Sequence, residues 1–184
     1  RIIPGKGLAD LIQAFKKISE KYNNIKLDIC GGVDPKFYWE INESKRYLSY
    51  CQKLAKNDSK IIFHGQINPK EKDKYFLNTD IFIHPHTNYN NRREGWGLVI
   101  NEALSYGLPV IATSNLGSAT TLIKHGKNGF IIEPGNIDQL TKKLNFFIDN
   151  PEIIKKYSEE SMKIFYNYHK PNKIRERLKK FVNS

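Results

Sequence analysis

Two glutamates, Glu94 and Glu102, flank a Gly-Trp-Gly turn in the stretch REGWGLVINEALSYGLPVIAT, residues 93–113. A glycine turn that opens a helix leaves the first backbone N–H groups without helical partners, and the positive end of the helix dipole adds to them. Such a helix start binds phosphate, and glycine lets the phosphate approach the backbone closely. The turn therefore predicts an anion site at a helix start near Gly97 or Leu98.

The two carboxylates extend this prediction to sugars on either side of the phosphate. Leu98 and Glu102 are four residues apart, so Glu102 lies about one turn inside the helix. A carboxylate beside phosphate is repelled unless it accepts hydrogen bonds, and the hydroxyls of a ribose supply them. Glu94 precedes the turn and can serve a second polyol, which predicts a nucleoside diphosphate with a sugar at each end. The alternative places Glu94 in a solvated loop and Glu102 on a helix surface.

Short apolar segments alternate with helical patterns along the chain. Strands are expected at residues 25–32, 60–65, 80–85, 109–113 and 129–134. Helices are expected after Gly7, across 34–57 as one or two, near Pro69, from Gly97 or Leu98, through Ile123, and from near Ile137, Pro151 and Pro171. This alternation predicts a doubly wound, Rossmann-like α/β domain with a parallel sheet covered on both faces. Ligands lie beyond the carboxyl ends of such strands, so we expect the loops after Cys30, Phe63, His84 and Ala112 to line one cleft.

Composition limits the partners. The 184 residues (21.4 kDa) fit one domain. The formal charge of +11 favours an anionic partner, although lysines spread along the sequence are equally typical of solvated surface. The two cysteines, Cys30 and Cys51, form no metal or disulfide pattern, which favours a reducing compartment. His84 and His86 at a strand end are expected to serve packing and hydrogen bonding.

The motif resembles that of family 4 retaining glycosyltransferases with the GT-B fold, which carry a Glu-x7-Glu motif of the form EGFGLxxxEAMAxGxPVIA. Here it stands as EGWGLVINEALSYGLPVIA, with Trp96 for the usual Phe. Four further segments resemble the family in the same order: RIIPGKGLADLIQAF (R-x4-KG), FHG, DIFIHPH and GKNGFIIEPGN. The resemblance extends over nearly the whole chain. It identifies residues 1–184 with the carboxyl-terminal, donor-binding domain, one half of a GT-B architecture.

The resemblance implies a role for each matching residue. The implied donor-binding residues are Arg1, Lys6, Gly65, Gln66, Gly95, Trp96, Gly97, Leu98, Val99 and Glu102, and the implied catalytic residue is Glu94. Arg1 and Lys6 would neutralise the charge that grows on the diphosphate as the glycosyl bond breaks. The backbone after the glycine turn would hold phosphate oxygens, Glu102 the ribose and Glu94 the transferred sugar. The loop at Gly65 would run near the base.

Some positions remain open or depart from the family pattern. Trp96 can pack inside the domain or form a platform for a sugar. Arg92 and Arg93 can assist an anionic donor or lie in a solvated loop. Where the family often has GGxxE, this chain has GSATT, with Thr121 at the place of the acid. Ser118 or Thr120 is then expected to cap the short helix that follows.

The beginning of the chain predicts a longer polypeptide. RIIPGKG has the pattern of a strand end and a turn, and the family's first strand ends just before Arg1. That strand normally lies in the middle of the sheet, so we expect either a gap there, or a strand supplied from outside residues 1–184. The acceptor site in such enzymes belongs to an amino-terminal domain, which these residues do not include. The fragment alone is therefore expected to be inactive.

The predicted activity is transfer of a sugar, with retention, from a nucleotide-diphosphate sugar to a saccharide or lipid-linked acceptor, in bacterial surface polysaccharide synthesis. We expect no metal ion, no cofactor beyond the donor and no nucleic-acid partner. We expect a cytoplasmic location, with contact at the inner face of the plasma membrane through the basic terminal helices as an option. The alternatives are a GT-B-fold nucleotide-sugar epimerase and, suggested by the charge alone, a nucleic-acid-binding module.

Overall fold

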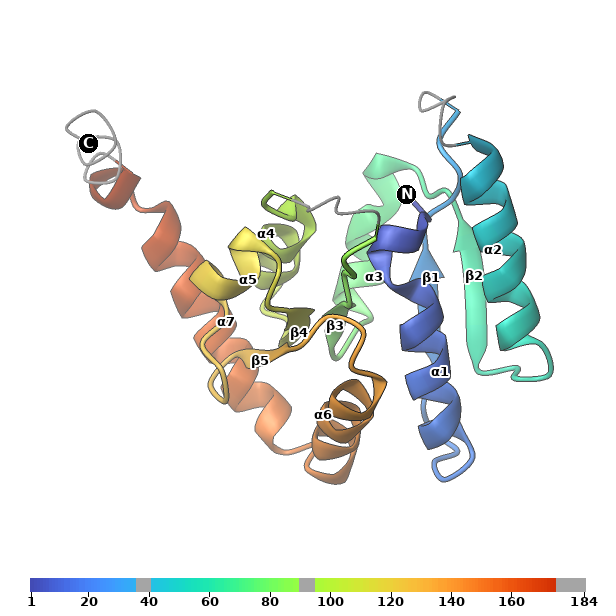
Figure 1. The fold of residues 1–184 in the computed structure, drawn as a ribbon. Helices are drawn as coiled ribbons and strands as arrows, with labels where there is room; N and C mark the ends of the chain where they lie inside the picture. Colours follow the sequence, from blue (N-terminus) through green and yellow to red (C-terminus); the bar gives the residue numbers. More distant parts are fainter. Residues whose placement is uncertain (36–40, 90–94, 175–184) are drawn as a thin grey trace.

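The computed structural model describes residues 1–35, 41–89 and 95–174, and Figure 1 shows their arrangement. The strands are β1 (Leu27–Cys30), β2 (Ile61–Gly65), β3 (Phe82–His84), β4 (Val110–Thr113) and β5 (Gly129–Ile132). The α-helices are α1 (Leu8–Ser19), α2 (Ile41–Ala55), α3 (Lys72–Leu77), α4 (Leu98–Ser105), α5 (Gly117–Leu122), α6 (Ile137–Asp149) and α7 (Ile153–His169). Two short 3-10 helices are η1 (Pro4–Lys6) and η3 (Pro69–Glu71), and residues 171–174 are also helical. Each strand and each α-helix lies where the alternation predicts it, whereas η1 stands where a turn was expected.

The strands form two parallel sheets with a gap between them. One sheet has the order β1-β2 and the other β3-β4-β5, with Leu27 opposite Ile61 and Ile83 opposite Ile111. In the described part of the chain, β1 and β3 each pair on one side, and their other edges face each other across the gap (Figure 1). Of the two outcomes expected for this place, a gap or a strand supplied from outside residues 1–184, the structure shows the gap.

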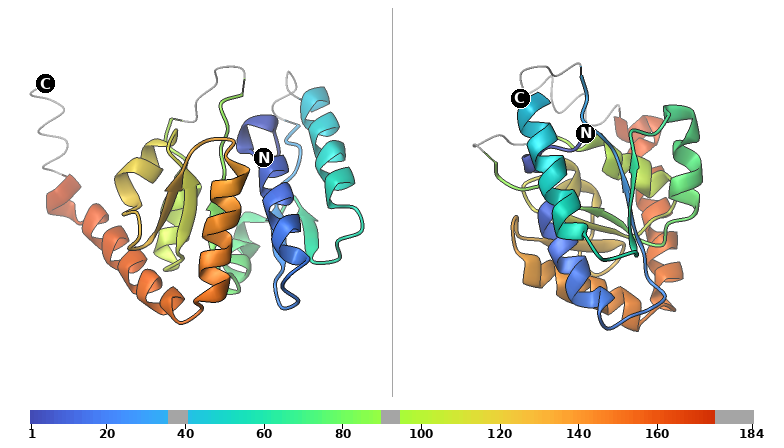
Figure 2. Two further views of the ribbon diagram at one scale, coloured as in Figure 1. Left: turned by 60° about the horizontal axis from the view of Figure 1, so that its bottom comes forward. Right: turned by 90° about the vertical axis from the view of Figure 1, so that its right-hand side faces the viewer.

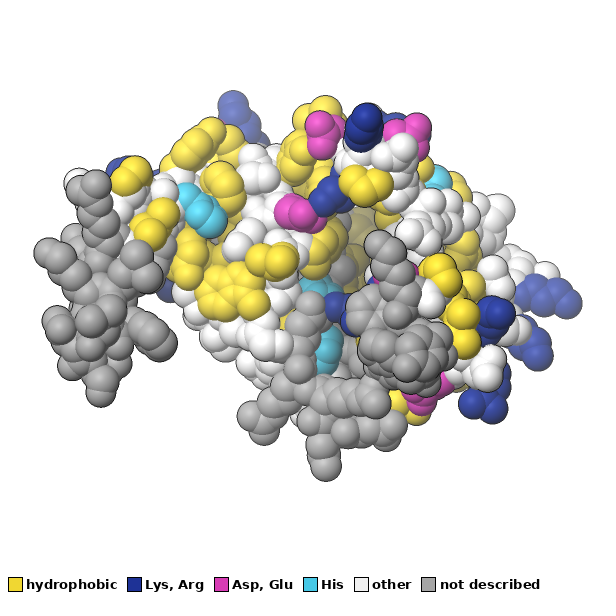
Figure 3. All heavy atoms as spheres, turned by 90° about the horizontal axis from the view of Figure 1, so that it is seen from above, with side chains coloured by type: hydrophobic (Ala, Val, Ile, Leu, Met, Phe, Trp, Pro, Cys, Tyr) yellow, Lys and Arg dark blue, Asp and Glu magenta, His cyan; other side chains and the backbone are white. Residues whose placement is uncertain are grey.

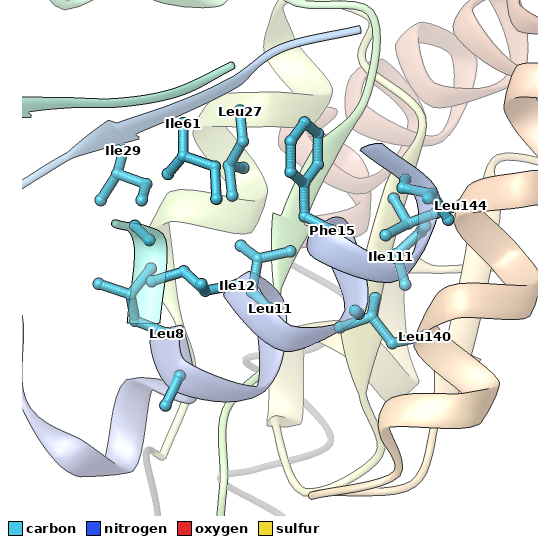
Figure 4. Close-up of a cluster of buried hydrophobic side chains, with 14 of the residues drawn as sticks. Leu8, Leu11, Ile12, Phe15, Leu27, Ile29, Ile61, Ile111, Leu140 and Leu144 are labelled. Atoms are coloured by element: carbon cyan, nitrogen blue, oxygen red, sulfur yellow. The ribbon is translucent and has the colours of Figure 1, made fainter. Parts of the chain in front are cut away.

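Helix α1 joins the two sheets on one face. Its apolar residues recur at helical spacing, and Leu11, Ile12 and Phe15 are buried. They pack in one cluster with Leu27 of β1 and Ile111 of β4, so the same helix contacts both sheets (Figure 4). The cluster also contains side chains of α2 and α6, which flank α1 in Figure 2. The packing of this face thus spans the gap.

A second cluster centres on α4. Its residues Ile100, Ala103 and Leu104 are fully buried and pack with Val110 of β4 and Leu122 of α5. Partly buried aromatic side chains of α7 cover the cluster, and α4 and α7 lie side by side. Helices therefore cover both faces, which confirms the doubly wound α/β class.

A cleft of about 1420 Å³ runs between the two sheets. Its apolar part, which we call the strand gap, is lined by Leu11, Phe15, Leu27, Ile29 and Ile83. Its other part, which we call the upper cleft, lies at the carboxyl ends of the strands and is lined by Arg1, Lys6, Gln66, Lys72, Trp96 and Leu98. The sequence predicts the ligand-binding site in the upper cleft.

Candidate functional site

Helix α4 opens onto the upper cleft at the Gly95–Gly97 turn. Gly97 is the N-cap and has φ of +82° and ψ of 63°, a left-handed conformation that favours glycine. The first helical bond runs from the Ile100 N–H to the Gly97 carbonyl at 3.0 Å, so the N–H groups of Leu98 and Val99 precede it. Both residues line the cleft, and Leu98 is 70% exposed. The mouth of the helix is therefore open, as an anion site requires.

Helix α5 holds this turn in place. The Ser118 N–H donates to the Trp96 carbonyl at 3.0 Å, and the Ser118 hydroxyl donates to the Gly97 carbonyl at 3.2 Å. Any Cβ at Gly117 would lie 2.6 Å from the Gly95 carbonyl oxygen, so the approach of α5 to the turn needs glycine there. These contacts fix the direction of the first N–H groups of α4.

The expectation that Ser118 or Thr120 caps α5 is wrong. The N-cap of α5 is Leu116, and no side chain caps it. The Ser118 hydroxyl donates to the Gly97 carbonyl instead. The Thr120 hydroxyl donates to the Gly117 carbonyl at 3.1 Å inside the helix. Ser118, which stands where the family pattern has glycine, therefore stabilises the Gly95–Gly97 turn and does not cap α5.

Trp96 has the packing role considered for it, and its role as a platform for a sugar stays a prediction. It is half-buried, and its ring stacks on Tyr168 of α7 with centroids 6.1 Å apart. It also lines the cleft. Trp96 therefore packs against the domain and supplies one wall of the site.

The two predicted cations come from the beginning of the chain. Arg1 and Lys6 both line the cleft. The Ile2 N–H donates to the Gly32 carbonyl at 2.9 Å, which holds this segment at the carboxyl end of β1. Gly7, which follows η1 at φ +66°, packs against the loop after β3, where an added Cβ would lie 1.7 Å from the Pro85 carbonyl oxygen. Lys6 is thereby brought to the same cleft as α4.

The loop after β2 also reaches the cleft. Gly65 ends the strand in a left-handed conformation (φ +69°), and its carbonyl accepts from the Gly31 N–H at 2.8 Å. Gln66 lines the cleft beyond it. Gly65 itself is not part of the lining and acts by turning the chain.

Glu102 forms an ion pair that the sequence does not predict. The Lys72 Nζ lies 2.6 Å from the Glu102 Oε1, and the side chains are 36% and 40% exposed. Lys72 begins α3 and lines the cleft, whereas Glu102, on α4, is not among the lining residues and reaches the cleft wall through Lys72. Lysines at positions 70, 72 and 74 alternate in this segment, and nothing in that pattern distinguishes the middle one.

Glu94, like Arg92 and Arg93, lies outside the described residues. The expectation that the loop after Ala112 lines the cleft is wrong, because that loop packs instead. Its Asn115 amide contacts the His86 Nδ1 at 3.1 Å and donates to the Asn88 side chain at 2.9 Å.

His84 and His86 are buried, with ring centroids 6.2 Å apart, so both pack as expected, and His86 has the Asn115 amide as a hydrogen-bond partner. Within the described ranges, no group of three or more His, Cys, Asp or Glu side chains gathers closely enough to hold a metal ion. Figure 3 looks onto the carboxyl ends of the strands and shows a hollow there, with hydrophobic side chains in its floor and charged and histidine side chains around it.

Residues 1–164 match the family described as Glycosyl transferases group 1, and the chain belongs to this family. It is 29% identical over 184 residues to the capsular polysaccharide biosynthesis glycosyltransferase CapM of Staphylococcus aureus, covering 100% of this chain and 44% of that protein. It is 29% identical over 178 residues to the poly(glycerol-phosphate) alpha-glucosyltransferase of Bacillus subtilis, covering 95% of this chain and 24% of that protein. The chain thus spans less than half the length of these relatives.

Solved structures share the fold. Anabaena Alr3699/HepE in complex with UDP superposes with a TM-score of 0.77 at 22% identity, covering 100% of this chain and 46% of that chain. The C-terminal domain of the glycosyl transferase group 1 family protein LpcC from Francisella tularensis gives 0.76 at 24% identity, covering 93% of this chain and 83% of that domain. The expected fold, one half of a GT-B architecture, is confirmed.

Proposed function

We propose that this domain binds a nucleotide-diphosphate sugar and that the intact protein transfers the sugar to a saccharide or lipid-linked acceptor with retention of configuration. The single observation that carries the proposal is the open start of α4 at Leu98, which faces a cleft that Arg1 and Lys6 also line. Backbone N–H groups, a helix dipole and two cations directed at one hollow suit a diphosphate. Family membership and a capsular polysaccharide enzyme among the relatives support a role in bacterial surface polysaccharide synthesis.

Each group would act on a different part of the donor. As the bond between the sugar carbon and the phosphate oxygen breaks, the bonding electrons move to the diphosphate. Arg1, Lys6 and the N–H groups of Leu98 and Val99 would stabilise that charge without a metal ion. Glu102 would accept hydrogen bonds from ribose hydroxyls. Glu94 would hold the transferred sugar with the adjacent backbone, and the segment at Gln66 would lie near the base.

We propose further that these residues are one domain of a longer glycosyltransferase. The strand gap lies between the edges of β1 and β3, its walls are apolar, and Arg1 lies at the carboxyl end of β1. A strand leading into Arg1 would run parallel to both edges and would satisfy their backbone groups. An acceptor-binding domain before that strand would close the cleft from the other side.

The location that we propose for the intact protein depends on the class of its acceptor. No helix in the described ranges has the length and apolar character needed to cross a bilayer. If the acceptor is lipid-linked, the intact protein would work at the inner face of the plasma membrane, where the lysines of α7 would meet anionic headgroups. Vesicles that contain anionic lipid would then bind the protein more strongly at low salt than at high salt.

Calorimetry on the intact protein tests the proposed site. UDP, GDP and their sugar conjugates are titrated against wild type, Glu102→Ala and Glu94→Ala, with Glu160→Ala on α7 as a matched surface control. We expect Glu102→Ala to weaken nucleotide binding about tenfold, the loss of roughly one charge-assisted hydrogen bond. Glu94→Ala should mainly reduce transfer.

If both variants bind and transfer as wild type, the site assignment is wrong. Salt-dependent binding to random DNA, without any response to nucleoside diphosphates, would instead favour a nucleic-acid module. Conversion of the donor sugar without an acceptor would favour an epimerase.

A further inference from the structure

Lys72 joins the two walls of the upper cleft through Glu102. Its Nζ lies 2.6 Å from the Glu102 Oε1, and the lysine side chain itself lines the cleft together with Gln66 and Leu98. The pair therefore connects the wall formed by α3 with the helix whose mouth faces the proposed diphosphate. Neither the glycine turn nor the Glu-x7-Glu motif accounts for the presence of this lysine.

We propose that Lys72 is a positioning residue for the donor: it holds one oxygen of Glu102 and thereby directs the carboxylate toward the ribose hydroxyls. This inference rests on the proposed function. A carboxylate has two oxygens with about four acceptor sites, so an ammonium on Oε1 leaves capacity for a diol. The bond is charge-assisted, which favours a fixed geometry before the donor arrives.

The ammonium also answers an electrostatic difficulty of the site. Glu102 lies one turn inside the helix whose start would bind a diphosphate, and the two negative groups repel each other. A lysine in contact with Glu102 compensates its negative charge and so reduces the repulsion between the carboxylate and the phosphates. A helix start with an acidic residue one turn away binds an anion more strongly when a cation compensates that residue.

Tethering α3 to α4 is the competing role, and other contacts already perform it. The Tyr106 hydroxyl at the end of α4 donates to the Asp73 carboxylate of α3, and its ring stacks on Phe76 with centroids 4.9 Å apart. An ion pair as exposed as Lys72 and Glu102 adds little to folding stability. Removal of the ammonium should therefore leave α3 in place.

The test compares UDP with 2′,3′-dideoxy-UDP by calorimetry on the intact protein. Lys72→Met should weaken UDP binding about tenfold, close to the loss of one charge-assisted hydrogen bond, and should weaken dideoxy-UDP binding clearly less, because dideoxy-UDP loses only the compensation of the Glu102 charge. Lys72→Arg should restore most of the UDP affinity. Tyr106→Phe removes the other polar tie between α3 and α4 and keeps the ring, so it should bind both nucleotides as wild type does. The double variant Lys72→Met/Glu102→Ala should lose no more UDP affinity than Glu102→Ala alone.

Two results would overturn the inference. One is that Lys72→Met binds UDP as wild type does while Glu102→Ala binds it weakly. That result would refute the role of Lys72 and would still support the proposed function. The other is an equal loss for UDP and dideoxy-UDP, which would mean that Lys72 acts on the phosphates, on the base or on folding. If Glu102→Ala also binds UDP as wild type does, the proposed site itself fails.

Discussion

Gly97→Ala tests whether the left-handed turn at the start of α4 forms the binding site. The native φ of +82° lies in a region that costs an alanine about 1–2 kcal/mol. The new Cβ would also lie 3.2 Å from the Ser118 Oγ, which must shift and weaken its bond to the Gly97 carbonyl. Because a domain of this size loses roughly 2–4 °C per kcal/mol, we expect the melting temperature to fall by roughly 2–8 °C.

The matched control is Gly107→Ala at the other end of the same helix. Gly107 has φ of +73°, and a Cβ there would lie 2.9 Å from the Ser158 Oγ. The strain is comparable, but Gly107 packs against α7 and is not part of the cleft lining. Both variants should therefore lose similar stability in a thermal melt.

Nucleotide affinity should separate the two variants. Alanine at position 97 would turn the first N–H groups of α4 away from their native direction, and loss of one charge-assisted bond of about 1.5–3 kcal/mol weakens binding roughly 10–100-fold. Isothermal titration with UDP should show that loss for Gly97→Ala and native affinity for Gly107→Ala. Equal affinities in the two variants at equal stability loss would refute the reasoning.

Three further predictions concern the fold. Burial raises the pKa of Asp28, but hydrogen bonds from His64 and a neighbouring lysine outweigh it and hold the pKa below its usual range. The ionised Asp28 therefore stabilises the fold. This stabilisation is full above the unfolded-state pKa of about 4 and is lost as the pH falls through the folded-state pKa. Asp28→Asn should therefore flatten the loss of stability in acid unfolding curves below about pH 4. Burial raises the pKa of the Cys51 thiol to about 11, so a thiol reagent at neutral pH should label the exposed Cys30 and reach Cys51 only after unfolding; rapid labelling of both would contradict the packing of α2. Phe147→Ala should cost about 3–5 kcal/mol in denaturant unfolding, because its ring is fully buried, and a cost under about 1 kcal/mol would contradict the cluster under α6.

Local signals in the sequence were sufficient for most of the fold. Leu11, Ile12 and Phe15 recur at helical spacing after Gly7, and α1 begins and packs where that pattern predicts. Gly97 predicts the start of α4 because few other residues adopt its backbone conformation. The gap between the sheets was among the predicted outcomes, because the family resemblance places the end of a central strand just before Arg1.

Contacts made by side chains far apart in the sequence were not predictable. Lys72 reaches Glu102 across 30 positions, and a long lysine in a run of alternating lysines gives no sign of its partner. Ser118 has the side chain of a helix cap, but the close approach of α5 to the turn provides the Gly97 carbonyl as a better acceptor. In both cases tertiary packing decided between hydrogen bonds that the local sequence left open.

A crystal structure of the intact protein with UDP would test the central claim most directly. We predict phosphate oxygens about 2.7–3.2 Å from the backbone nitrogen of Leu98 or Val99, with the ribose hydroxyls turned toward Glu102. A bound UDP whose phosphates lie away from the start of α4 would contradict the account.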